Sequence, residues 1–175
     1  MQKSSLSPLL GAACIAAALA LSACSPTLNW RQVQGSNAPY SVLMPAKPAS
    51  FSRPVNLDGL QVTMTMTAAE VDDVSYAVGS AELADASQAP HALNAMKTAM
   101  VNNIKGTIRK EKVGGVATAP NAIDIEAASA DNPPTVLFAR FTTKGKWVYQ
   151  AIILGPEKSV TPEAVDTFFS SFKVN

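Results

Sequence analysis

Val136-Leu-Phe-Ala-Arg-Phe-Thr-Thr143, Lys144-Gly145-Lys146 and Trp147-Val-Tyr-Gln-Ala-Ile-Ile-Leu154 form the stretch of sequence that decides the fold. Its two long runs are rich in β-branched and aromatic residues, which is typical of β-strands. The segment between them is short enough for a tight turn only. The two runs are therefore expected to pair as an antiparallel hairpin. Gly155-Pro156 ends the second strand.

N-terminal to this hairpin, apolar and polar residues alternate with the period of half-buried strands. The clearest run is 60–66, and Asp58-Gly59 before it is a strong signal for a hairpin turn. Asp72-Asp73 turns the chain again. With a loop at 46–52, these signals predict an antiparallel meander with strands at 40–44, 53–57, 60–66 and 74–78.

Two segments have the period of an α-helix instead. From about Pro90 to Gly106, apolar residues recur at three- and four-residue spacing, which predicts an amphipathic helix that stops at Gly106. Thr161 is a good N-cap, and Pro162 suits the first position of a last helix. The residues expected to face inward from that helix are Ala164, Val165, Phe168, Phe169 and Phe172.

Further strands are expected at 107–113 and from Ile123 onward. The fold class is therefore α+β: an antiparallel β-sheet of about seven or eight strands with two helices packed on it. Residues 38–175 are expected to form this single domain.

The N-terminus carries the pattern of an export signal. Lys3 precedes an apolar run, Leu9–Leu21, that is shorter than the roughly 20 residues a membrane-spanning helix needs. An uncleaved membrane helix is therefore the weaker interpretation, and Ser25-Pro26 directly after the cysteine also disfavours it. Ala23 is the small residue that a signal peptidase requires before its cleavage point.

Leu21-Ser22-Ala23-Cys24 resembles the lipobox of bacterial lipoproteins at every position. The resemblance implies cleavage between Ala23 and Cys24, a diacylglycerol thioether on Cys24 and N-acylation of the new N-terminus. Several acyl chains would hold the protein on the membrane, whereas one chain is a marginal anchor. Cys14 is a poor alternative, because Gly11 stands where the lipobox has leucine.

The chain thus divides into a signal peptide at 1–23, a lipidated N-terminus and tether at 24–37, and the domain at 38–175. Within the tether, Trp30–Val33 could lie at the membrane interface or form a short edge strand on the domain, and its strand propensity favours the strand. Ser25 stands where an aspartate would resemble the inner-membrane retention signal of enteric lipoproteins. The expected location is the outer membrane, facing the periplasm.

A second resemblance concerns the domain. Tyr40-Ser-Val-Leu-Met-Pro45, the central helix, Trp147-Val-Tyr149 and the terminal Phe168-Phe169-Ser-Ser-Phe172 look like the PsbP-like α/β/α sandwich. That fold occurs in a photosystem extrinsic subunit and in bacterial lipoproteins. Because the shared positions are core and turn positions, the resemblance implies a fold and very little about function.

Composition excludes some functions. The 175 residues include 14 Lys and Arg against 13 Asp and Glu, and loss of Lys3 with the signal peptide leaves the two equal. A neutral chain has no bulk attraction to nucleic acid. The 2 cysteines are Cys14 and Cys24, so the domain has no thiol and no disulfide. No cofactor or metal is expected, since no motif for either is present.

Candidate catalytic residues are few. His91 is the one histidine, and a nucleophile elbow is absent. A hydrolase built on His91 is a third hypothesis, behind two non-enzymatic ones. The first is a lipid-anchored interaction or envelope-assembly module, whose partner is an unidentified envelope protein. The second is a binder of a small apolar ligand.

The second hypothesis rests on methionines. Met64 and Met66 share a strand face, and Met96 and Met100 share a helix face, so the four are expected to meet where helix and sheet pack. Thioethers could also bind Cu(I) there. Burial periodicity favours an ordinary core. A basic stretch, 105–112, could contact anionic lipid or polymer, although a solvated sheet edge is the simpler interpretation.

Overall fold

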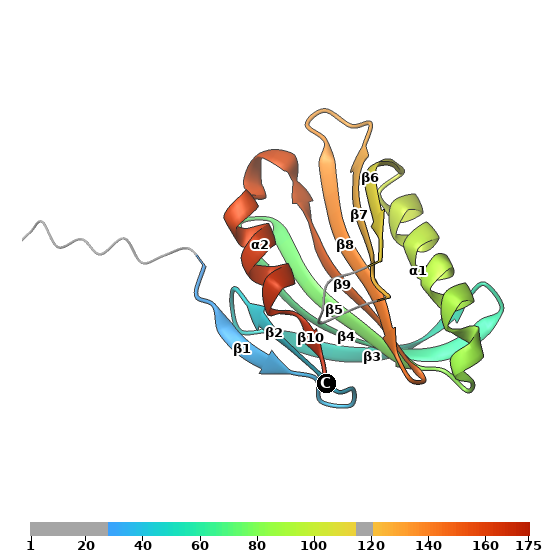
Figure 1. Cartoon of the computed structure of the whole chain (residues 1–175). Coiled ribbons are helices and arrows are strands. Elements are labelled where there is room, and N and C mark those ends of the chain that lie inside the picture. Colours follow the sequence, from blue (N-terminus) through green and yellow to red (C-terminus); the bar gives the residue numbers. More distant parts are fainter. Residues whose placement is uncertain (1–27, 115–120) are drawn as a thin grey trace, which may run out of the picture.

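The computed structural model describes residues 28–114 and 121–175, and within these it contains ten strands and two α-helices. Seven strands form one antiparallel sheet in the order β3-β4-β5-β9-β8-β7-β6 (Figure 1). The strands of this main sheet are β3 (Ala49–Leu57), β4 (Leu60–Val71), β5 (Val74–Glu82), β6 (Gly106–Val113), β7 (Ile123–Ser129), β8 (Thr135–Lys144) and β9 (Trp147–Pro156). The expected α+β class is confirmed.

A small second sheet joins the two ends of the described chain. It has the order β1-β2-β10 and is antiparallel throughout, with β1 (Arg31–Gln34), β2 (Tyr40–Met44) and β10 (Lys173–Val174). The expectation that 40–44 belongs to the meander is therefore wrong, because β2 pairs with β1 and β10 instead. β10 is too short to carry a sequence pattern.

The hairpin expected over 136–154 is present as β8 and β9. Lys144 pairs with Trp147, so the turn consists of Gly145 and Lys146, and Gly145 has a φ of 59°. Asp58-Gly59 also turns as expected, with φ values of 51° and 95°. The Asn56 side chain closes that turn by accepting a 2.6 Å hydrogen bond from the Gly59 N–H.

The expected loop at 46–52 is partly wrong, because β3 already begins at Ala49. Pro54 suggested a late strand start. β3 is the edge of the main sheet, however, and an edge strand tolerates a residue without an N–H. Every residue of β3 pairs with β4, and Ser50 and Ser52 also hydrogen-bond through their hydroxyls to Thr67 and Thr65 at 2.8 Å.

Both helices form where the sequence places them. α1 (Ala89–Asn103) has proline in its first turn, and the chain leaves it through Lys105 with a φ of 48° before β6 starts at Gly106. α2 (Pro162–Ser171) is capped by the Thr161 hydroxyl, which accepts from the Ala164 N–H at 3.3 Å.

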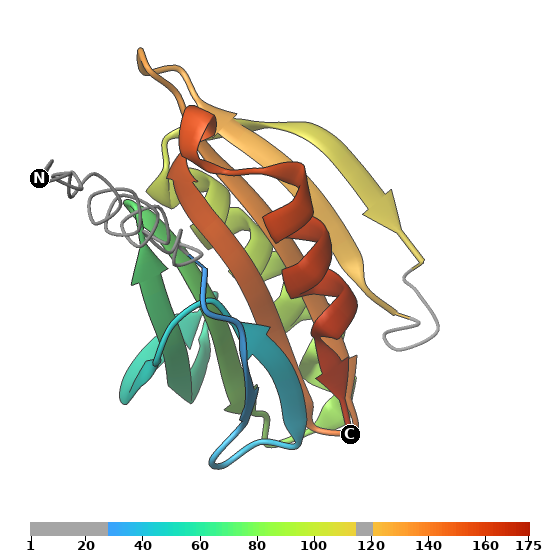
Figure 2. The same ribbon diagram turned by 90° about the vertical axis from the view of Figure 1, so that its left-hand side faces the viewer.

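The two helices cover opposite faces of the main sheet (Figure 2). One core contains α1 side chains packed on the odd-numbered residues of β8. The other contains α2 and the small sheet, packed on Tyr76, Tyr149 and their neighbours. Of the residues expected on the inner face of α2, Ala164, Phe168 and Phe172 are buried, whereas Val165 and Phe169 are partly exposed.

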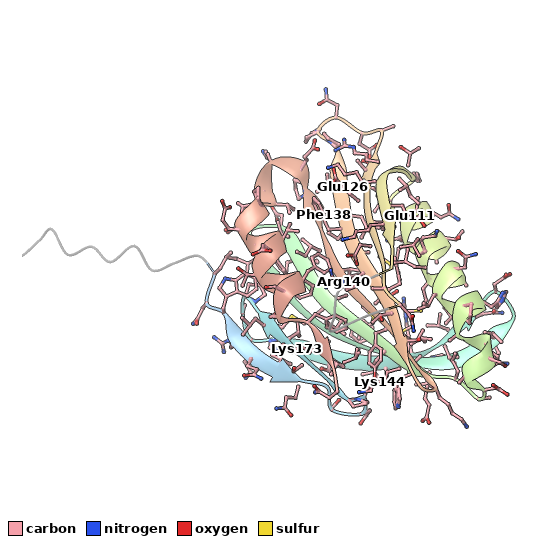
Figure 3. All side chains as sticks on the ribbon, in the orientation of Figure 1. Glu111, Glu126, Phe138, Arg140, Lys144 and Lys173 are labelled. Atoms are coloured by element: carbon pink, nitrogen blue, oxygen red, sulfur yellow. The ribbon has the colours of Figure 1, made fainter. Side chains whose placement is uncertain are left out.

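Arg140 is a buried charged residue of β8, labelled in Figure 3. Its guanidinium donates two hydrogen bonds to the Asp124 carboxylate, at 2.7 and 2.9 Å, and a third to the Phe169 carbonyl at 2.9 Å. It also lies 5.4 Å from the centre of the Phe169 ring. Arg140 therefore links β7, β8 and the last turn of α2.

We expect Asp124→Ala to lower the free energy of unfolding by about 3 kcal/mol, because it leaves the buried Arg140 charge without its partner. Glu126→Ala is the matched control. Glu126 is two residues along on the same strand face and pairs with Lys110, whose side chain is 77% exposed, and an exposed pair contributes less than about 1 kcal/mol. Urea unfolding of both variants measures the difference, and equal losses would contradict a structural role for Arg140.

Tyr149 is fully buried, and its hydroxyl has no hydrogen-bond partner among residues 28–114 and 121–175. Burial, with a smaller effect of Tyr40, raises the pKa of this hydroxyl to about 12. Removing a buried hydroxyl without a partner is favourable, so we expect Tyr149→Phe to raise the free energy of unfolding by about 1 kcal/mol at neutral pH.

The same substitution tests the pKa. In the unfolded chain a tyrosine loses its proton near pH 10, whereas folded Tyr149 keeps its proton to about pH 12. The unfolded state therefore binds fewer protons in this interval, and stability falls as the pH rises. Denaturant unfolding at stepped alkaline pH should show a smaller fall for Tyr149→Phe than for the wild type. An unchanged fall would contradict the raised pKa.

Candidate functional site

The predicted lipidation site, Ala23 and Cys24, lies outside the residues that the structure describes. The described chain begins at Leu28, and it is already part of the folded body there. The Asn29 N–H donates to the Pro45 carbonyl at 2.7 Å, and Trp30 packs edge-on against Tyr76 with ring centres 5.9 Å apart.

These contacts correct the expected tether. Residues 31–34 form β1 and pair with β2, as the edge-strand interpretation of Trp30–Val33 anticipated. The body therefore starts ten positions before residue 38. The physical reason is that β1 covers the otherwise open edge of β2, which a free tether would leave exposed.

The four methionines of the predicted ligand seam lie on the α1 side of the sheet. Met64 and Met96 are 4% and 1% exposed, and Met66 and Met100 pack against the same core. The Gln150 amide donates to the Met66 sulfur at 3.7 Å. Gly79 makes room for this contact, since a Cβ there would lie 2.7 Å from that sulfur. This packing is that of a core, and a ligand in the seam stays a prediction.

Two of the four basic residues of the stretch 105–112 contact acidic side chains. Lys110 contacts Glu126 at 2.6 Å, and Arg109 contacts Glu157. Glu111, on the strand face opposite to Lys110, contacts Lys97 of α1 at 2.8 Å. The arrangement fits a solvated sheet edge more closely than a surface for anionic polymers.

His91 connects the start of α1 to the β3–β4 turn by a hydrogen bond. Its Nε2 lies 2.8 Å from the Asp58 carbonyl oxygen. Because a carbonyl can only accept, Nε2 must carry the hydrogen. The Asp58 carboxylate lies 3.5 Å from the same nitrogen. With Nε2 engaged by the backbone, His91 is positioned to hold the turn rather than to activate a nucleophile.

A groove lies beside this contact, between the β3–β4 turn and the outer face of α1. Its volume is about 390 Å³. The two sides are held together by the His91 contact, and small residues of α1 form the floor. The groove is lined by Asn56, Asp58, His91, Asn94, Ala95, Thr98, Ala99 and Asn102.

The described residues were searched for metal-binding groups and for membrane-spanning helices. Residues 28–114 and 121–175 contain no group of three or more His, Cys, Asp or Glu side chains placed to hold a metal ion. Within the same ranges, neither helix has both the length and the apolar character that crossing a bilayer requires.

The chain has also been compared with known proteins. No protein-family model matches it, and a search of curated proteins finds no match. The roles of the groove residues therefore rest on their own geometry and chemistry.

Sequence patterns contained a signal for the groove. Asn94, Thr98 and Asn102 recur at every fourth position and are expected on the outer face of the helix. Apart from Lys97, the helix has few charged residues on that face, which also includes Ala95 and Ala99, whereas the outer face of a surface helix normally carries several charged residues. The opposite wall, Asn56 and Asp58, comes from a distant turn that no local pattern assigns to the helix.

Proposed function

We propose that the chain is a lipid-anchored module of a bacterial cell envelope, held by Cys24 and acting by binding rather than by catalysis. One observation carries the proposal: a complete lipobox is followed, after residues 25–27, by a folded body. Four peptide units from Cys24 to Leu28 reach at most about 14 Å. An anchor at Cys24 would therefore keep the body close to the membrane surface.

The short spacer also gives the body an orientation. The end that carries Leu28 and Trp30 would face the bilayer, together with the turn at Val71-Asp72. A shallow groove of about 510 Å³ lies at this end and is partly lined by these residues. Trp30 is only partly buried, which suits an aromatic side chain near a membrane interface.

The hydrogen bonds of His91 and Arg140 favour binding over catalysis. The His91 nitrogen is engaged by a backbone carbonyl, and Arg140 donates to the Asp124 carboxylate and the Phe169 carbonyl. Neither is arranged as an acid–base group beside a nucleophile. The proposed location is the outer membrane with the body in the periplasm, because Ser25 lacks the charge of the aspartate retention signal.

We expect metabolic labelling with palmitate to mark the wild-type chain and to be lost in Cys24→Ala, which should leave the membrane fraction. The thiolate of Cys24 is the nucleophile that receives the lipid, and alanine has none. Cys14→Ala is the matched control and should label normally. Labelling and membrane retention of the Cys24→Ala variant would overturn the proposal.

A further inference from the structure

The groove along α1 has an unusual lining for a protein surface. Asn56, Asn94, Thr98 and Asn102 supply neutral donors and acceptors, and Asp58 is the sole acidic side chain that lines it. The one lysine of α1, Lys97, turns away and contacts Glu111 on β6. The chemistry of the groove is therefore that of amides and hydroxyls.

The floor of the groove is low because Ala95 and Ala99 lie one helical turn apart and have short side chains. From His91 to Asn102 the helix rises about 16 Å, so the groove can follow an extended ligand over that length. Neighbouring amides at four-residue spacing present repeated hydrogen-bonding groups along this path.

The walls are held in place before any ligand arrives. The Asn56 side chain closes the β3–β4 turn through the Gly59 N–H, and His91 fixes the same turn to the helix. A site whose walls are already positioned loses less conformational freedom on binding. Asparagine and threonine also have few rotatable bonds, which keeps the cost of ordering them low.

The groove and the chain's N-terminal end belong to opposite sides of the main sheet. Leu28, Trp30 and β1 pack with the α2 core, whereas α1 covers the other face (Figures 1 and 2). A body anchored through its N-terminus would therefore hold the groove away from the bilayer, toward the periplasm.

We propose that this groove binds a neutral, hydroxyl-rich glycan chain. Amide and hydroxyl side chains pair with sugar hydroxyls and acetamido groups, which are both donors and acceptors. The Asp58 carboxylate disfavours an anionic ligand. A protein partner would need an apolar anchor, and the alanine floor offers little apolar area. This inference names the partner class of the anchored module, and so rests on the proposed function for its cellular setting.

The test is titration calorimetry of the purified full chain, in a detergent without a sugar headgroup, with a tetramer of N-acetylglucosamine as the probe. We expect measurable binding by the wild type. The double variant Asn94→Ala/Asn102→Ala removes two amides and should bind at least about tenfold more weakly. Ala99→Arg keeps every amide but fills the floor, and it should also weaken binding.

Asn103→Ala is the matched control, since Asn103 is exposed on the same helix and does not line the groove. It should bind as the wild type does, and circular dichroism should show that all variants fold. The proposal is overturned if the wild type fails to bind the tetramer at about 10 mM, or if the groove variants bind as tightly as the control. Capture of a protein through these residues, without tetramer binding, would also overturn it.

Palmitate labelling separates the two proposals. A chain that labels at Cys24 but does not bind the tetramer retains the anchored-module function and loses the glycan assignment. A chain that does not label at Cys24 but binds the tetramer retains the glycan assignment and loses the anchored-module function.

Discussion

The structure depends on the burial of the central strands of the main sheet on both faces. Val148 and Tyr149 are consecutive residues of β9, point to opposite sides and are both fully buried. A sheet with such strands must be covered twice, because either face left open would expose aromatic and branched side chains to water. α1 provides one cover. α2 is too short to provide the other alone, and the small sheet completes it.

This need for a second cover explains why the two ends of the domain meet. β2 lies between β1, from the N-terminal end, and β10, from the C-terminal end. The Ser171 hydroxyl strengthens the junction, since it accepts from the Leu43 N–H at 2.9 Å and donates to the Phe168 carbonyl at 2.8 Å. A pull on the N-terminus would therefore act on β-sheet pairing and on the α2 core together, which suits a body held at that end.

Local patterns predicted the elements well, and long-range packing explains what they missed. The β8–β9 hairpin, the Asp58-Gly59 turn and the Thr161 cap are each determined by a few adjacent residues, and all three were predictable. The pairing of β2 with β10 joins residues far apart in the chain, and the ion pair of Arg140 joins residues 16 positions apart on neighbouring strands. Arg140 lies in an apolar strand, but nothing in that strand identifies Asp124 as its partner.

The two candidate sites, the lipobox and the groove, also differ in whether local sequence or the fold determines them. The proposed lipobox is a linear motif that a protease and a lipid transferase would recognise without the fold, so sequence alone can suggest it. The groove exists only because α1 lies beside a turn formed more than thirty residues earlier, as the separation of 33 positions between Asp58 and His91 shows. The proposed anchoring by a linear motif and the proposed recognition by a folded surface would impose separate constraints on the chain. β1 and α1 lie on opposite faces of the main sheet, so we expect that the sequence near Cys24 and the lining of the groove can each change without disturbing the other.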